Sequence, residues 1–175
     1  IADPGGDNKF YYSGQGNPVM KIYQYESRDK TVIETFKDDI IITPSISSSN
    51  QDVVTMGCGW TNTVTYTIPS TWESGYYAAC LEDEYCKKKY VTFLVKSGSS
   101  ISNKKVALIA NTNTWAAYNA YNVGSSQKGT KYENNTNQSY SFMRPNDFSN
   151  PMAQITNRTR AELWIYTWLK DNGYD

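Results

Sequence analysis

The feature that most constrains the fold is a strict alternation of polar and apolar residues in short segments rich in aromatic and β-branched side chains. In residues 63–68 three threonines alternate with Val64, Tyr66 and Ile68, and residues 90–95 alternate in the same way. A period of two places successive side chains on opposite faces of a β-strand. The fifteen tyrosines and five tryptophans suit such strands, because aromatic rings pack well on a pleated surface.

Further strands are expected on both sides of these segments. Residues 19–25 and 31–36 read as a pair separated by a charged turn, and residues 52–60 and 70–81 continue the β pattern. Several short strands at regular spacing indicate a mainly β chain that begins with an antiparallel β-sandwich of the jelly-roll type. We assign this sandwich to residues 1–97.

A different pattern follows the polar linker at residues 96–105. The run "VALIA" at residues 106–110 is continuously apolar, which is typical of a strand buried on both faces of a parallel sheet. Residues 98–175 therefore read as the beginning of an α/β domain. Its strand is expected at about 104–110 and is followed by a long polar loop.

A helix is predicted at about residues 156–172. Its apolar residues recur at helical intervals, and Gly173 provides a C-terminal stop. The apolar residues are Ala161, Trp164, Ile165, Trp168 and Leu169. One strand and one helix cannot cover each other's apolar faces, so we expect the remaining strands to lie beyond Asp175. The alternative is that this segment packs on the first sheet or on another chain.

Charge and composition exclude several classes of function. Lys and Arg (17) balance Asp and Glu (17), which gives no general attraction to nucleic acid or anionic lipid. No apolar run approaches the ~20 residues of a membrane helix. Histidine is absent, which excludes Ser-His-Asp and Cys-His nucleophile systems within these residues.

Cysteines and glycosylation sequons favour an exported protein. Cys80 and Cys86 flank a hairpin, where a disulfide could close a short loop, and the fate of Cys58 stays open. N-x-Ser/Thr sequons mark three asparagines as glycosylation candidates in a secreted protein. They are Asn134, Asn137 and Asn157.

The polar and aromatic stretch at residues 111–122 is the candidate binding region, because open α/β sheets gather binding groups after the carboxyl ends of their strands. Polar side chains there could orient a substrate between aromatic walls, with Arg144 donating to a carbonyl or carboxylate. The candidates on this stretch are Asn111, Asn113, Trp115, Tyr118 and Asn119. The alternative is architectural, with Trp115 and Tyr118 sealing the junction between the two units and Arg144 bracing its loop.

Glu162 is the one acid in the middle of the predicted helix. Arg158 lies one turn before it and offers an ordinary i,i+4 partner, so we interpret Glu162 as structural.

Five ordered motifs resemble the large-subunit family of N,N-dimethylformamidase. They are "GCGWTNTVTYTIPSTWESGYYAACL", "YVTFLVK", "KKVALIANTNTWAAYNAYNVG", "YSFMRPN" and "ELWIYTWLKDNGYD". The resemblance extends from about residue 19 to the end of the chain. It implies a β-sandwich followed by a glutamine-amidotransferase-like domain, and an amidohydrolase that splits a small N-alkylated formamide into amine and formate.

The resemblance also implies an iron centre of two tyrosines and one carboxylate. Tyr118 matches an iron-ligating and catalytic tyrosine first, and the second ligand is open between Tyr132 and Tyr140. The family's carboxylate comes from a downstream His-containing Glu-Tyr-Trp motif that this sequence lacks. We therefore expect this chain alone to bind no iron and to be inactive.

Two functions from different classes follow. The first is a segment of an iron-dependent amidohydrolase of small N-substituted amides. The second is a secreted, glycosylated structural or carbohydrate-interacting protein that assembles with copies of itself, since an element without partners in its own chain can be completed by a neighbour.

Overall fold

A four-stranded antiparallel sheet organises the molecule in a computed structural model. The structure describes residues 1–14, 18–28, 31–41, 52–61, 64–97, 106–121, 130, 139–152 and 159–174. The sheet has the strand order β3-β2-β5-β6, and a separate two-stranded ribbon pairs β1 with β4. The strands are β1 (Asp7–Phe10), β2 (Val19–Arg28), β3 (Thr31–Ile41), β4 (Val64–Thr67), β5 (Gly75–Glu82) and β6 (Lys88–Val95).

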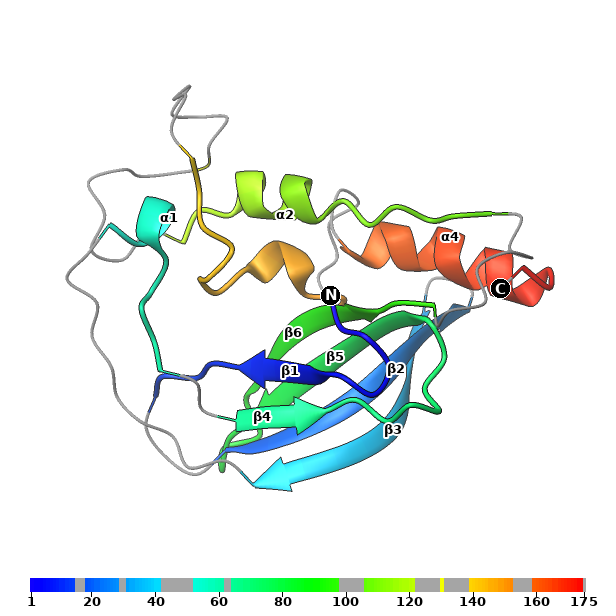
Figure 1. Ribbon diagram of the computed structural model, residues 1–175, viewed down its shortest axis with the longest axis horizontal. Helices are drawn as coiled ribbons and strands as arrows, with labels where there is room; N and C mark the ends of the chain where they lie inside the picture. The colour runs from blue at the N-terminus through cyan, green and yellow to red at the C-terminus, as the bar shows by residue number, and fades with distance from the viewer. Residues whose placement is uncertain are drawn as a thin grey trace.

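Helical elements cover the face of the sheet opposite the ribbon (Figure 1). They are α2 (Thr112–Tyr118), the short 3₁₀ helix η2 (Asp147–Ser149) and α4 (Thr159–Asp171), while α1 (Val53–Met56) stands apart from this layer. The described chain is thus a ribbon, a sheet and a helical layer. Its strands pair antiparallel, which confirms the prediction of a mainly β, antiparallel fold.

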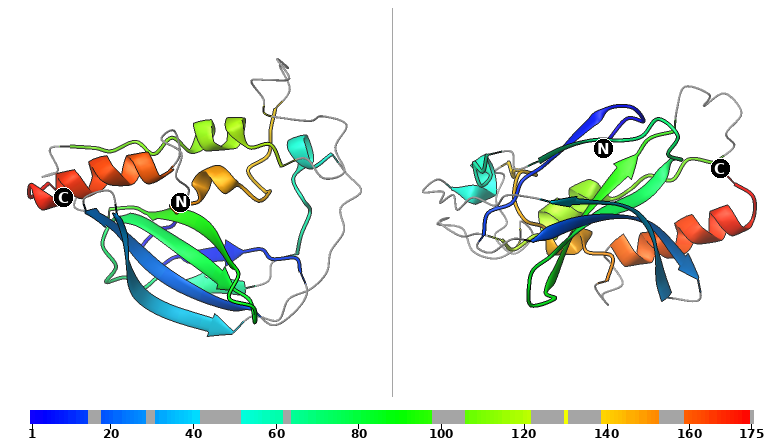
Figure 2. Two further views of the ribbon diagram at one scale, coloured as in Figure 1. Left: turned by 180° about the vertical axis from the view of Figure 1, so that it is seen from behind. Right: turned by 90° about the horizontal axis from the view of Figure 1, so that it is seen from below.

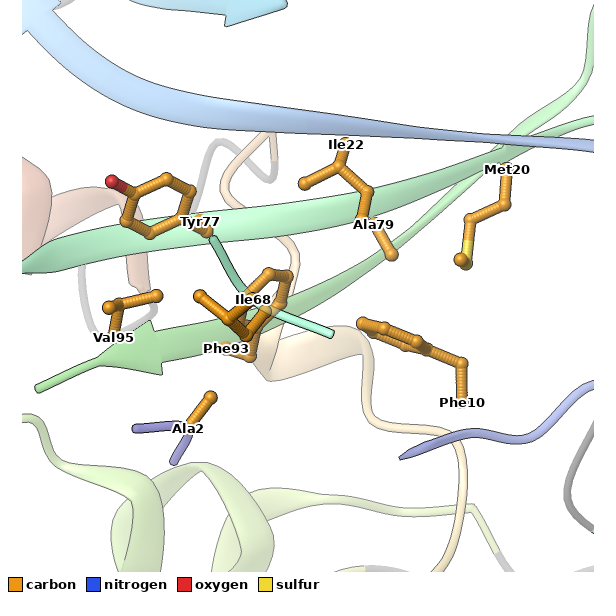
Figure 3. Close-up of a cluster of buried hydrophobic side chains, with 9 residues drawn as sticks. All are labelled: Ala2, Phe10, Met20, Ile22, Ile68, Tyr77, Ala79, Phe93 and Val95. Atoms are coloured by element: carbon orange, nitrogen blue, oxygen red, sulfur yellow. The ribbon is translucent and has the colours of Figure 1, made fainter. Parts of the chain in front are cut away.

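The first core lies between the sheet and the β1-β4 ribbon. Side chains of both layers point toward one another there, including Phe10 and Ile68 from the ribbon side and Tyr77 and Phe93 from the sheet (Figure 3). The Tyr77 ring is fully buried and stacks on Trp72 with ring centroids 4.7 Å apart. Aromatic rings with large apolar areas therefore hold the ribbon to the sheet.

The second core lies between the sheet and the helical layer. It joins Tyr25, Tyr76 and Ala78 of the sheet to Trp115 of α2 and Leu163 of α4. Because both faces of β5 and β6 are covered, the alternation at residues 90–95 sorts side chains between two cores. Phe93 and Val95 enter the first core, while Tyr90 and Leu94 pack against the second.

Residues 52–56 were expected to be part of a strand, and that prediction is wrong. They form the single helical turn α1, because the Asp52 side chain accepts a hydrogen bond from the Val54 N–H at 3.0 Å and caps the helix. Gly57 then ends the helix with φ of 80°, a conformation that glycine adopts without strain. A local capping interaction outweighed the β propensity of two valines.

The predicted interior strand at 106–110 is also not formed. The part of this segment that the structure describes belongs to neither sheet, and Ile109 is 82 % exposed. It runs on the helical side of the sheet toward α2 (Figure 1). A parallel strand needs hydrogen-bonded neighbours along its edges, and part of the outer edge of β6, at Leu94–Lys96, is already hydrogen-bonded to Ala2.

The predicted disulfide between Cys80 and Cys86 is likewise absent, and both residues are thiols. Cys80 is buried inside β5, where its cross-strand partner is Tyr90. Cys86 is exposed in the turn between β5 and β6. In this register Cys80 lies opposite Tyr90, which follows the turn, so Cys80 and Cys86 are not cross-strand partners.

The last helix forms as predicted but turns a different face to the protein. Gly173 has φ of 76°, and the Tyr174 N–H donates to the Leu169 carbonyl, so the C-terminal stop is confirmed. The buried positions are Thr159, Leu163 and Thr167. Trp164, Ile165 and Trp168 are 37 %, 55 % and 60 % exposed instead. Within the residues that the structure describes, no helix is long and apolar enough to cross a membrane.

Candidate functional site

The stretch at residues 111–121 is part of the helical layer, and some of its side chains are buried while others are exposed to solvent. Asn111 occupies the N-cap position of α2; Trp115, Ala116 and Ala117 are buried, and Trp115 packs in the core shared with the sheet. Asn111 and Asn113 are exposed. The aromatic and small residues thus anchor a short helix, and the asparagines of its first turn are presented to solvent.

Glu162 connects three elements at this anchor. Its carboxylate accepts hydrogen bonds from the Trp115 indole N–H at 2.8 Å and from the Tyr76 hydroxyl at 2.9 Å. The backbone N–H of Asn111 lies 3.4 Å from the same carboxylate. Glu162 therefore joins α4 to α2 and β5, which agrees with a structural role, although the partner predicted for it, Arg158, lies outside the described residues.

The Tyr76 phenol stays neutral in this arrangement. Burial raises the pKa of Tyr76 well above its ordinary value, and the neighbouring Glu162 charge and their hydrogen bond raise it further. A neutral phenol can donate to a carboxylate, whereas a phenolate cannot. Tyr76 is thus a hydrogen-bond donor to Glu162 in this arrangement.

Arg144 organises the loop that follows α2. Its side chain is 9 % exposed, and its guanidinium makes four hydrogen bonds to backbone carbonyls. The acceptors belong to Ala116, Asn119, Tyr121 and Ser141. The rigid donor fork of arginine suits several fixed acceptors at once. The structure thus places Arg144 inside the framework as a brace.

Asn119 is part of the same framework. It is buried, its amide donates to the Pro145 carbonyl at 2.7 Å, and its side-chain oxygen accepts from the Tyr121 N–H at 3.1 Å. Of the candidate substrate-binding residues, Trp115, Asn119 and Arg144 therefore have polar groups occupied by internal partners. Asn111 and Asn113 are the candidates whose side chains lie at the surface.

A buried thiol adjoins this loop. Cys58 lies between two glycines of positive φ, and its N–H donates to the Met143 carbonyl at 2.8 Å. Burial raises the pKa of the Cys58 thiol, while a hydrogen bond with the Tyr121 hydroxyl and the nearby Arg144 charge oppose that rise. The backbone at Gly57 passes so close to Met143 that a Cβ on Gly57 would lie 2.8 Å from the Met143 Cβ. The Gly-Cys-Gly sequence is the one feature of the sequence that could have indicated this close backbone approach around Cys58.

A protein-family comparison decides the relationship. Residues 22–175 match the family described as N,N-dimethylformamidase beta subunit-like, C-terminal. The chain belongs to this family. The match spans both the sheet and the helical layer of the dimethylformamidase-like chain, which confirms the resemblance of the motifs. No curated protein and no solved structure matches the chain.

Of the iron centre that the family resemblance implies, the structure describes Tyr118, whereas Tyr132 lies outside the described residues. Tyr118 is half-buried and stacks on Phe148 with ring centroids 5.6 Å apart. Glu162, a carboxylate on this layer, accepts hydrogen bonds from Trp115 and Tyr76. Within the described ranges, no group of three His, Cys, Asp or Glu side chains could hold a metal ion.

Several predicted sites lie outside the described residues. Tyr132, the second predicted iron ligand, is one of them, and the three sequon asparagines are the others. Tyr140, the alternative to Tyr132, is described, and its hydroxyl donates to the Asn113 carbonyl at 3.3 Å. The iron-ligand and glycosylation predictions for the undescribed residues stay predictions.

Proposed function

We propose that this chain forms the sheet-and-helix framework of an amidohydrolase acting on small N-substituted amides, and that the framework alone does not turn over substrate. Membership of the dimethylformamidase-like family over residues 22–175 is the observation that carries this proposal. The bracing of α2 by Arg144 and Glu162 supports it, because a binding group works best when its position is fixed in advance.

Within this framework, the first turn of α2 presents the substrate-facing groups. The side chains of Asn111 and Asn113 can donate to and accept from an amide, and they stand on a helix whose other side is held by the Trp115 indole. Their task is to orient a polar substrate. The activating metal of the family, if acquired, would act as a Lewis acid on the amide carbonyl.

Metal content and amine release test the proposal together. The purified chain, incubated with iron and desalted, is expected to retain iron far below one equivalent and to release no amine from N,N-dimethylformamide. The reason is that this sequence contains no Glu-Tyr-Trp motif, which is the source of the carboxylate that the family resemblance implies. Near-stoichiometric iron, together with turnover that Tyr118→Phe abolishes, would overturn the proposal. The matched control is Tyr85→Phe, which changes an exposed tyrosine in a hairpin turn.

A further inference from the structure

The helix α4 ends in an asparagine followed by a glycine. Asn172–Gly173 is the one Asn-Gly pair in the sequence. In such a pair the backbone nitrogen of the glycine can attack the side-chain amide carbon of the asparagine, because glycine has no Cβ to obstruct the approach. The C-terminal end of α4 lies at the margin of the molecule in both views of Figure 2. Both residues are exposed, so water reaches the reacting groups.

The surroundings of Gly173 leave room for this attack. A Cβ placed on Gly173 would meet no atom of the described chain within 4 Å, apart from its own neighbours in sequence. Two other exposed asparagines, Asn111 and Asn113, differ in this respect because each precedes a threonine. The branched threonine side chain crowds its own backbone nitrogen. The chemistry is therefore favoured at Asn172.

The C-terminal cap of α4 restrains both reacting groups. The Asn172 side-chain amide donates to the Trp168 carbonyl at 2.8 Å. Two further hydrogen bonds form a Schellman motif. They run from the N–H groups of Gly173 and Tyr174 to the carbonyls of Lys170 and Leu169, each at 3.0 Å. The amide must turn and the Gly173 nitrogen must lose its proton before they react, so the cap has to open first.

We propose that Asn172 is a site of spontaneous deamidation whose rate is set by opening of this cap. Helix ends open locally at a small cost in free energy. In the open state the Gly173 nitrogen gives up its proton to water and bonds to the Asn172 Cγ. The Cγ–Nδ2 bond then breaks, and the nitrogen leaves as ammonia. A water molecule opens the resulting cyclic imide at either carbonyl, which leaves aspartate or isoaspartate. The proposal does not rest on the amidohydrolase function.

Either product weakens the end of α4. The new carboxylate follows Asp171 at the C-terminus of the helix, where the helix dipole disfavours negative charge. It also lacks the N–H that donates to the Trp168 carbonyl. Isoaspartate adds a methylene group to the backbone, which shifts the Gly173 N–H away from its acceptor. The modification therefore loosens the cap that had slowed it.

Peptide mapping by mass spectrometry locates the modification after the purified chain has been incubated under mildly alkaline conditions. Asn172 is expected to convert first, and a protein isoaspartyl methyltransferase should label the isoaspartate product. Asn111 and Asn113 are the internal controls and should remain unmodified. An intact Asn172 at the end of the incubation, or earlier conversion of Asn111 or Asn113, would overturn the proposal.

A pair of variants at Tyr174 tests the cap. Tyr174→Pro removes the N–H that donates to the Leu169 carbonyl, so conversion of Asn172 is expected to become about fivefold faster. Tyr174→Ala keeps this N–H and should convert at the rate of the unchanged chain. The chain unfolded in denaturant should convert about tenfold faster than the native chain or more. Equal rates for the two variants, or for the native and unfolded chains, would contradict control by the cap.

Discussion

Replacing Arg144 with alanine is expected to lower the free energy of unfolding by about 3–5 kcal/mol. Four backbone carbonyls lose their donor, and the residues Ala116 and Asn119 that carry two of them are buried, so water cannot replace the guanidinium freely. Each buried acceptor left without a partner costs about 1–3 kcal/mol. Chemical denaturation monitored by circular dichroism measures the change.

Two variants control this experiment. Arg144→Lys keeps the charge but supplies a point donor in place of a fork, so it should recover less than half of the lost stability. Lys89→Ala removes an exposed cation from β6 and should change stability by less than about 0.5 kcal/mol. A loss below about 1 kcal/mol for Arg144→Ala would show that the loop does not depend on this side chain.

Leu163→Ala is expected to cost about 2–5 kcal/mol, whereas Trp168→Ala should cost less than about 1 kcal/mol. Leu163 is fully buried between α4 and the sheet, and Trp168 is 60 % exposed. Deleting a buried leucine leaves a cavity, while deleting an exposed ring mainly changes solvated surface. Denaturant midpoints of the two variants measure the difference.

The ranking of these two variants decides which face of α4 packs on the sheet. The apolar periodicity alone would bury the tryptophans and expose Leu163. A larger loss for Trp168→Ala than for Leu163→Ala would mean that the helix is rotated by about half a turn from the orientation described above. The Tyr76–Glu162 hydrogen bond could not then form.

The strands could be predicted from the sequence because their signal is local. Strands β2 to β6 each lie within or overlap a segment that alternation or β propensity had marked, and Gly173 ends α4 as its position after the apolar pattern predicted. The family was also visible in the order of short motifs, which a match over residues 22–175 confirms. Local residue patterns and the order of motifs can be recognised in a sequence without knowledge of its tertiary contacts.

The contacts between distant residues could not be predicted. Glu162 meets Tyr76 across 86 positions of sequence, and Arg144 meets Ala116 across 28. Nothing in the neighbourhood of Glu162 distinguishes these partners from Arg158, one helical turn away. The orientation of α4 fails for the same reason, because the side of the helix that packs is chosen by hydrogen bonds and by the shape of the sheet surface.

The apolar run at 106–110 misled in a different way. Continuous hydrophobicity is shared by interior strands and by segments that pack along one side of a layer, so the pattern cannot distinguish them. In the structure the following residue, Asn111, reaches Glu162 while Ile109 remains in solvent. Most of the polar and aromatic cluster that follows lies at the interface between the sheet and the helical layer.

We expect the contacts between the sheet and the helical layer to make them one cooperative unit, and native-state hydrogen exchange in increasing denaturant tests this directly. The backbone amides of Ala78 in β5 and of Leu163 and Thr167 in α4 should exchange with the same free energy and the same denaturant dependence, because Glu162 and Trp115 tie them together. Exchange of the α4 amides at much lower denaturant, with β5 still protected, would show that residues 1–97 and 98–175 fold as independent domains.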